Sequence, residues 1–524
     1  MPNKFLNQLY RRYARTENGA LSNATTGLVT LDYFANCGTY RNRELATVFA
    51  DLQAMWRESP QQTLRIIFYN RLITRQIKGG QSTEKVQHGQ GNRSEFRRSL
   101  IWLARQQPTV LYRNLHLVPA VGSWKDLWHT DLLGELDQAR VFELIAAGLA
   151  DDQQRALLAK YLPRIRSRAN THTDRHQALN TFAHALLRYL QWTPREYRQF
   201  KASGTAHHFQ RQMGAGNWAA IDFQRIPGKA LSQLVNNTGR DGKSTFQRHG
   251  VEDRYTAWIE QQPVAKFTGY VYELIQQARK AKSSAQIMTL NKQFAGLIEL
   301  AKKDGGGIRG NVWCALDTSS SMQARVANTS AYDICISLGI YFATLNEGVF
   351  RDHVIMFDSV SQALQLYGDF YTKYRCITSA KTAWGSTNFQ SVIDEIVRIR
   401  RNHPDLPVED FPRTLIVVSD MQFNPTQGLG QTNYEAAMHK LAAVGLPKLR
   451  IVWWWVTGRG QDFPATLDDE GVIMIGGFDG SILSLLLGTS TEASHVEGGV
   501  SVDAGPEAAM RKALDQEILN RLQC

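Results

Sequence analysis

After residue 305 the chain alternates short apolar runs with segments of helical periodicity, and this alternation limits the possible fold more than any other feature. Helical stretches such as FQSVIDEIVRIR (389–400) separate the runs. Strands that alternate with helices build a largely parallel sheet covered on both faces. We therefore predict a doubly wound α/β domain over residues 305–490. The apolar runs are NVWCALD (311–317), HVIMFD (353–358), RTLIVVSD (413–420), KLRIVWWWV (448–456) and GVIMIG (471–476).

The first 304 residues follow a different period. In RELATVFADLQAMW (43–56) and QQTLRIIFYNRLITRQI (61–77) apolar residues recur at three- and four-residue steps, and Pro60 separates the two segments. No strand-like alternation competes strongly with this pattern before about residue 305. The rhythm of paired helices predicts a curved α-helical array of the HEAT-like repeat kind over residues 1–304. Residues 491–524 are expected to form a linker and one closing helix.

Charge is divided unevenly between these two parts. The net charge is +12, but residues 1–300 hold 41 Lys and Arg against 23 Asp and Glu, whereas residues 301–524 hold 19 against 25. Fixed positive charge releases counterions from phosphates, so a basic half favours a polyanion as partner. A basic surface that only keeps the protein soluble is the alternative.

Cysteine use and hydropathy bear on the compartment. The five cysteines are scattered, with no C-x-x-C spacing, which argues against a disulfide framework or a zinc ribbon. The first residues contain no apolar core of signal-peptide length, and no run of about 18 apolar residues follows. We expect a cytoplasmic monomer that does not bind a membrane.

Polar residues stand at three expected strand ends or loops of the α/β domain. Asp317-Thr318-Ser319-Ser320-Ser321 follows the first strand as D-x-S-x-S, Thr387 lies in a loop before a helix, and Asp420 ends a later strand. Ligands of doubly wound folds bind beyond the carboxyl ends of the strands, so these residues should converge. The alternative is that these side chains only cap the helices that follow.

An all-oxygen set of this kind suits a hard divalent cation, Mg²⁺ or Mn²⁺. We expect Ser319, Ser321 and Thr387 to contact the metal directly, and Asp317 and Asp420 to hold its waters and orient the hydroxyls. Because few carboxylates touch it, the cation would keep much of its charge and attract an acidic ligand. No nucleophile with a neighbouring base is apparent, so we expect no enzyme.

Basic residues interleaved with aromatic ones in the first part suit RNA, whose bases stack while its phosphates are neutralised. Arg71, Arg75 and Lys78 would share one helical face, as would Arg93 and Arg97. For any single residue, a solvated face is the alternative. The remaining candidates are Arg164, Arg166, Arg168, Arg211, Trp218, Arg225 and Lys229.

Other motifs give weaker indications of function. GRDGKST (239–245) is no phosphate loop, because Asn237 stands where G-x-x-x-x-G-K-[ST] needs glycine and no strand precedes it. KGGQSTEKVQHGQGN (78–92) is expected to be a surface loop. His172, His176 and His184 lack companion ligands, and the run Trp453 to Trp455 is expected to pack in the core.

D-x-S-x-S followed by a loop threonine and a strand-end aspartate resembles the metal-ion-dependent adhesion site of von Willebrand factor A domains. With a basic helical half before it, the chain resembles the Ro (TROVE) family of RNA-binding proteins. Supporting segments are VVSDMQF (417–423), GFDGSILSLL (477–486) and Trp218, Asp222 and Arg225 of NWAAIDFQRIPGKAL. T-E-N-G-A (16–20), T-T-G (25–27), I-K-G-G (77–80) and LVPAVGSWKDL (117–127) are similar to a group of Ro-like proteins.

This resemblance implies a ring of helical repeats closed by the von Willebrand-type domain. It implies small structured RNAs, Y-RNA-like, on the basic surface, and single-stranded or misfolded RNA ends in a central hole. It further implies a non-catalytic scaffold in RNA quality control or processing, working beside an exoribonuclease or an RNA-repair enzyme. The rival interpretation is a metal-dependent protein-interaction module that recruits an acidic partner.

Overall fold

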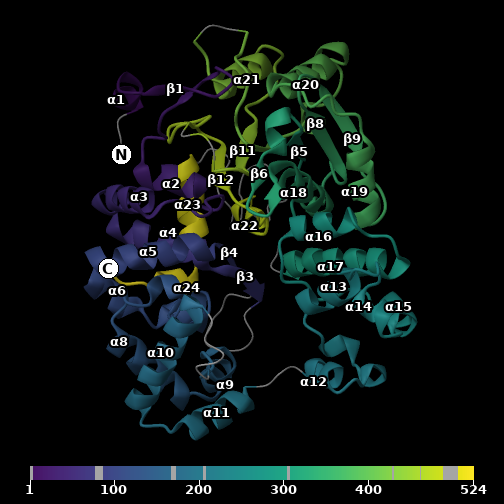
Figure 1. Cartoon of the computed structure of the whole chain (residues 1–524). Helices are drawn as coiled ribbons and strands as arrows, with labels where there is room; N and C mark the ends of the chain where they lie inside the picture. Colours follow the sequence, from purple (N-terminus) through teal and green to yellow (C-terminus); the bar gives the residue numbers. More distant parts are fainter. Residues whose placement is uncertain are drawn as a thin grey trace. The chain divides into compact units, whose positions relative to one another are not determined.

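The computed structural model divides the chain into two compact units (Figure 1). The first unit comprises Met1–Arg41, Thr74–Gln90 and Pro227–Asp515, and the second comprises Asn42–Ile73, Gly91–Ile226 and Gln516–Cys524. Each unit is therefore assembled from separate stretches of the chain. The structure describes residues 4–76, 86–166, 173–204, 208–303, 307–427, 430–458, 460, 462–487 and 505–524.

A six-stranded sheet forms the centre of the first unit. Its strands run in the order β12-β11-β10-β5-β8-β9 and pair in parallel, except that β9 is antiparallel to β8. Every residue of β5, β10, β11 and β12 is buried, as their unbroken apolar runs predict. The bounds are β5 (Val312–Asp317), β8 (His353–Phe357), β9 (Ser361–Gln365), β10 (Thr414–Ser419), β11 (Arg450–Trp455) and β12 (Val472–Gly476).

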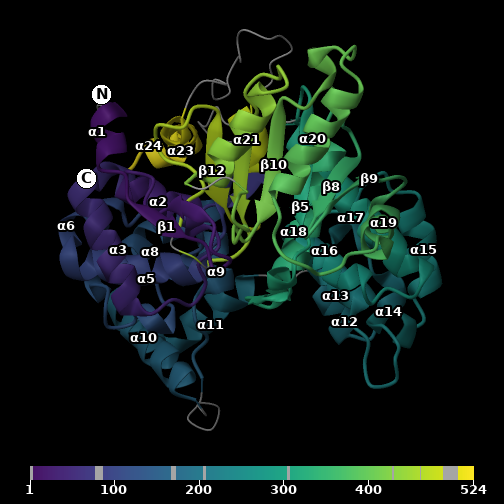
Figure 2. The same cartoon turned by 90° about the horizontal axis from the view of Figure 1, so that it is seen from above.

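Helices pack against the strands of this sheet (Figure 2). α18 (Ala331–Leu345) contacts β5 and β10, and α20 (Gln390–Asn402) contacts β8. At the other edge, α2 (Val29–Cys37) and α23 (Pro506–Leu514) both contact β12. The predicted α/β domain is thus present as a mixed sheet, and a helix from the start of the sequence belongs to it.

The helices that precede the sheet in sequence also belong to the first unit. α16 (Val271–Ala278) packs on α18 and on α17 (Ser284–Lys303). The predicted domain boundary at residues 304 and 305 therefore lies inside this unit. α13 (Gly228–Asn236), α14 (Thr245–Arg248), α15 (Glu252–Glu260), α19 (Phe370–Ser379), α21 (Asn433–Ala442), α22 (Ile482–Leu487) and α1 (Lys4–Leu9) complete its α-helices among the described residues.

The second unit is helical, as the sequence period predicts. Pro60 is the first residue of α4, the Asn92 side chain caps α5, and Thr193 with Glu196 forms a capping box at the start of α11. The α-helices are α3 (Leu45–Glu58), α4 (Pro60–Arg71), α5 (Arg93–Gln106), α6 (Pro108–Asn114), α7 (Leu117–Val121), α8 (Gln138–Ala150), α9 (Asp152–Tyr161), α10 (Asp174–Leu190), α11 (Pro194–Ser203), α12 (His208–Gly214) and α24 (Glu517–Asn520).

Short strands nevertheless form before residue 305, where no strand-like alternation competed strongly with the helical period. β1 (Tyr13–Arg15) and β2 (Leu21–Asn23) form a hairpin, and β3 (Ile73–Gln76) pairs with β4 (Val86–Gln90). The helix expected over residues 61–77 ends at Arg71, where β-branched Ile73 and Thr74 follow. Such side chains favour extended backbone, and strands this short leave little periodicity to detect.

Two global expectations can be compared with the structure. None of the helices in the described ranges is long and apolar enough to cross a membrane. The five cysteines, all of them described by the structure, form no disulfide, and Cys37, Cys314 and Cys335 are buried.

Candidate functional sites

Three loops meet beyond the carboxyl ends of β5 and β10. Leu316 of β5 is paired with Val418 of β10, so Asp317 and Asp420 leave neighbouring strands at the same edge of the sheet. The backbone amide of Ser320 donates to the carbonyl of Gly385 at 3.1 Å, which brings the loop with Thr387 to the same edge. We call Asp317, Ser319, Ser321, Thr387 and Asp420 the carboxyl-edge site.

Asp317 is fully buried at this site. Its Oδ1 accepts the Ser319 amide at 2.9 Å and its Oδ2 accepts the Ser419 hydroxyl. Burial and, after it, the nearby charge of Asp420 together raise the pKa of Asp317 to about 7. Among the described residues no basic side chain bonds Asp317. Two neighbouring buried carboxylates repel each other when both are charged, which favours a proton or a cation at this site.

The hydroxyls of the site are not used as helix caps. Ser319 stands at the N-cap of a short 3-10 helix but makes no side-chain cap bond, and its Oγ lies 3.0 Å from Oγ of Ser321. α20 has Phe389 at its N-cap, so Thr387 does not cap it either. The capping alternative therefore does not account for these three side chains.

The residues fit a hard divalent cation in their chemistry. Ser319, Ser321 and Thr387 would offer hydroxyl oxygens, and Asp317 and Asp420 would offer charge. Within the described ranges, no three His, Cys, Asp or Glu side chains gather into a metal site. A cation here would thus depend on the hydroxyls, and its binding stays a prediction.

Asp358 is a residue of this region that sequence reasoning missed. It follows β8, and its carboxylate accepts the amides of Ala383 at 2.9 Å and Val360 at 3.2 Å. Its carbonyl accepts the Asn388 amide at 2.8 Å. Asp358 therefore holds the loop that carries Thr387. An aspartate directly after a strand, as at Asp317 and Asp420, was the available signal.

The turn between β1 and β2 also reaches the carboxyl-edge site. Thr16 Oγ1 donates to the carbonyl of Phe423 at 2.7 Å, and the Glu17 amide donates to Oε1 of Gln422 at 2.6 Å. The Asn18 side-chain amide donates to the Gln422 carbonyl at 2.5 Å and lies 3.4 Å from Oγ1 of Thr387. T-E-N-G-A was noted as a family similarity, but nothing in the sequence placed it here.

Arg71 was expected to contact RNA, and this expectation is wrong. Only 1% of Arg71 is exposed, and its Nε and Nη2 lie 2.8 and 2.7 Å from Oδ2 of Asp126. Burial lowers the pKa of Arg71, opposed by the Asp126 charge. Arg97 binds the other oxygen of Asp126, with Nη2 at 2.9 Å. The pair of arginines on one buried carboxylate is a structural element of the second unit.

The other predicted arginines near this region differ in their settings. Arg93 is exposed at the start of α5, one helical turn before Arg97. Arg75 lies on β3 and not on a helical face with Arg71. Arg164 and Arg166 are exposed in the segment after α9. Lys78 and Arg168 lie outside the described residues.

The last group of predicted RNA contacts is partly paired with acids. Arg211 is exposed on α12, which packs on the short 3-10 helices that carry Trp218 and Arg225. Arg225 Nε lies 3.2 Å from the Asp222 carboxylate. Lys229, on α13 of the first unit, binds Glu273 at 3.0 Å. Thus the structure gathers Arg211, Trp218 and Arg225 within the second unit.

A cluster of cations around Tyr161 was not recognised as such in the sequence. The amines of Lys125 and Lys160 lie 5.1 and 5.3 Å from the Tyr161 ring centre. Burial and, to a lesser extent, the charges of Arg164 and Lys125 together lower the pKa of Lys201 to about 8. Within the described ranges neither Lys125 nor Arg164 has an ion-pair partner. We call these five residues the Tyr161 surface.

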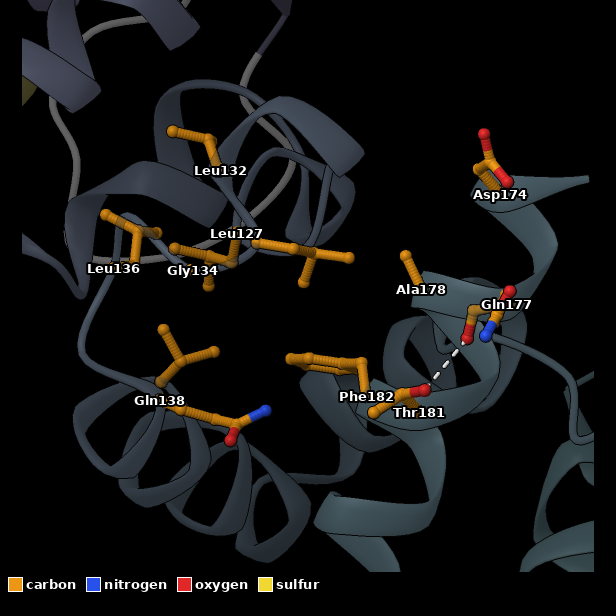
Figure 3. Close-up of a pocket in the computed structure, with 12 residues that line it drawn as sticks. Leu127, Leu132, Gly134, Leu136, Gln138, Asp174, Gln177, Ala178, Thr181 and Phe182 are labelled. Carbon is orange, nitrogen blue, oxygen red and sulfur yellow. Dashed lines mark hydrogen bonds between the residues drawn. The ribbon is translucent and has the colours of Figure 1, made fainter.

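The second unit also contains an apolar cavity of about 570 Å³. Figure 3 shows Leu127, Leu136 and Phe182 around it. Thr181 Oγ1 on its wall donates to the Gln177 carbonyl at 3.0 Å. No basic side chain is among its lining residues.

Two family models match parts of the chain. Residues 312–519 match a model described as domain of unknown function DUF7788, and residues 16–142 match domain of unknown function DUF2828. The first match contains the whole carboxyl-edge site. The second begins at Thr16 and contains Arg71, Arg93 and Arg97.

A curated relative is the uncharacterized protein L728 of Acanthamoeba polyphaga mimivirus, 23% identical over 90% of this chain and 84% of the relative. The crystal structure of the Deinococcus radiodurans Ro (RSR) protein aligns over 90% of both chains, with 12% identity and a TM-score of 0.31. An aerotolerance-related membrane protein from Bacteroides fragilis aligns over 41% of this chain and 89% of its own, with 20% identity and a TM-score of 0.20.

Proposed function

We propose that this protein is a non-catalytic RNA-binding scaffold whose second unit contacts RNA and whose first unit holds a divalent cation. The observation that carries the first part is the Tyr161 surface. Cations that depress the pKa of a neighbouring lysine repel one another, and a phosphate chain relieves this repulsion. Tyr161 offers a ring on which a base of single-stranded RNA stacks.

Exposed basic residues extend this proposed RNA surface within the second unit. Arg166 follows Arg164 in the same segment, and Arg93 and Arg211 are also exposed. Arg71 is excluded because it is buried against Asp126. The interface is therefore proposed to consist of exposed lysines and arginines, with Arg71 as structural support.

For the first unit we propose Mg²⁺ or Mn²⁺ at the carboxyl-edge site. Two observations support this assignment. The carboxylates of Asp317 and Asp420 are buried, and the hydroxyls of Ser319 and Thr387 do not cap a helix. The cation would supply a fixed positive charge at the edge of the sheet. The chain's own residues would hold and orient it, and no catalytic base accompanies them among the side chains described above.

By its sequence resemblance to the Ro family, the scaffold is proposed to carry small structured RNAs, Y-RNA-like, and single-stranded or misfolded RNA ends in RNA quality control or processing. A helical ring with a central hole, an exoribonuclease or RNA-repair enzyme as partner, and a cytoplasmic location belong to the same proposal.

The test is RNA binding by the full chain at rising salt. A Lys125→Gln/Arg164→Gln variant is compared with Lys280→Gln/Lys302→Gln, which removes the same charge from exposed positions of the first unit. Filter binding of a structured RNA with a single-stranded end is measured. Loss of two contacts to single-stranded RNA should reduce the slope of log affinity against log salt by about 1.4.

Comparing the two variants distinguishes RNA binding at the Tyr161 surface from a general attraction of RNA by the net charge of the protein. The proposal expects weaker binding and the smaller slope only for Lys125→Gln/Arg164→Gln. Equal losses in both variants would show that net charge alone attracts RNA. Absence of salt-dependent binding by the unmodified protein would remove RNA binding from the proposed function.

A further inference from the structure

The turn Thr16–Ala20 brings one carboxylate to the carboxyl-edge site. Its backbone is closed by hydrogen bonds from the Thr16 amide to the Ala20 carbonyl at 3.0 Å and from the Gly19 amide to the Thr16 carbonyl at 2.9 Å. Glu17 is the charged residue of this turn. Its side chain is exposed and has no hydrogen bond or ion pair with any described residue.

The backbone around Glu17 is fixed on both sides. The Glu17 amide is held by Gln422, which follows Asp420 by two residues, and the next residue, Asn18, lies against Thr387. The carboxylate is thus tethered next to one expected cation ligand, Thr387, while its own side chain stays free to rotate.

We propose that Glu17 is the acidic ligand of the cation at the carboxyl-edge site, so that the site closes on its own chain. This inference rests on the proposed cation site. A cation held mainly by hydroxyls keeps most of its charge and attracts a carboxylate. A carboxylate attached to the same chain is present at a high effective concentration, which an external acidic partner must overcome.

The charges of this edge agree with the inference. Besides Asp317 and Asp420, Asp462 is only 6% exposed, and its Oδ2 has no hydrogen-bond partner among the described residues. Burial raises the pKa of Asp462, and the charge of Glu17 raises it further. Glu17 therefore adds negative charge where buried carboxylates already lie, and a divalent cation offsets that repulsion.

The experiment is a titration of the full chain with Mn²⁺. The electron paramagnetic resonance signal of free Mn²⁺ measures how much of the ion is bound. Glu17→Gln removes the charge and keeps the shape of the side chain. Glu409→Gln is the matched control, because Glu409 is exposed and precedes the amino end of β10, opposite the carboxyl-edge site. Loss of the ligand should weaken Mn²⁺ binding about tenfold, and the control should bind like the unmodified protein.

Each outcome decides a separate point. If the unmodified protein binds Mn²⁺ and Glu17→Gln binds equally well, the inference is overturned while the cation site stands. If the unmodified protein binds no Mn²⁺, the proposed site falls and the inference with it. Glu17→Asp is the control for a substitution that merely disturbs the turn. It keeps the negative charge and should therefore bind Mn²⁺ more tightly than Glu17→Gln. Equal weakness of these two variants would contradict a ligand role.

Discussion

The side-chain amide nitrogen of Asn18 lies 3.4 Å from Oγ1 of Thr387, although 369 positions separate the two residues. The first hairpin of the chain is therefore part of the surroundings of the carboxyl-edge site. Thr16 anchors this hairpin, because its buried hydroxyl donates to Phe423 and accepts the Ala20 amide at 3.0 Å.

Thr16→Val should destabilise the first unit by about 1–3 kcal/mol, because two buried polar groups lose their partner while the shape is kept. Denaturant unfolding measures the change, and hydrogen exchange at Ala20 should become faster. Thr181→Val, at an exposed helical position, should change stability by less than about 0.5 kcal/mol. Similar effects of the two substitutions would mean that the turn is not anchored through Thr16.

Asp126→Ala should destabilise the protein by about 3–5 kcal/mol. The substitution leaves buried Arg71 without its counter-charge and also removes the carboxylate that pairs with Arg97. Glu135→Ala is the control, since Glu135 pairs with Arg105 at the surface and its loss should cost at most about 1 kcal/mol. Chemical denaturation compares them. A small effect of Asp126→Ala would restore Arg71 as a candidate for RNA contact.

Stability should rise with pH between about 8 and 10.5 through Lys201. Burial and the charges of Arg164 and Lys125 lower its pKa from 10.5 to about 8 in the folded protein. In this window the unfolded chain binds more protons than the folded one, so the free energy of unfolding increases with pH. Lys201→Met should remove this slope. The difference between the two pH profiles is measured, and identical profiles would contradict the lowered pKa.

Asp358→Ala should loosen the loop that carries Thr387, because the amides of Ala383 and Val360 lose their acceptor. We expect faster hydrogen exchange at Ala383 and a loss of about 1–3 kcal/mol of stability. Asp394→Ala, which removes an exposed partner of Lys440, should leave exchange at Ala383 unchanged. If the Ala383 amide exchanges equally slowly in both variants, another residue holds the loop.

Asp317→Asn should stabilise the protein when no divalent cation is present and abolish any stabilisation by added Mg²⁺. The substitution removes a carboxylate whose pKa is raised by burial first and by the charge of Asp420 second. Thermal unfolding with and without Mg²⁺ measures both effects. RNA affinity should be unchanged, because the Tyr161 surface belongs to the other unit. Loss of RNA affinity in the folded variant would contradict this division.

The sheet and its edge could be predicted because their signals are local. Strands buried on both faces appear as unbroken apolar runs, and Trp453, Trp454 and Trp455 are buried as expected. The polar residues at the strand ends then follow from topology: Asp317 and Asp420 end neighbouring parallel strands. The order of the strands was not needed to place them together.

The remaining features depend on contacts that the sequence does not encode locally. Arg71 is charged and lies near other basic residues, but its partner Asp126 is 55 positions away. Lys125 reaches the Tyr161 ring, and Lys125 and Arg164 both approach Lys201, only after folding. The first hairpin has strands of three residues, too short for a period, and its place beside Thr387 depends on hydrogen bonds to Gln422 and Phe423.

The stretch from residue 505 to residue 524 contributes α23 to the first unit and α24 to the second. During synthesis on the ribosome, neither unit can complete its core before this stretch has been translated. The surfaces of β12 and α4 that these helices cover remain accessible until then. Nascent chains should therefore depend on chaperones to avoid aggregation, and expressing either half of the sequence alone should yield insoluble protein.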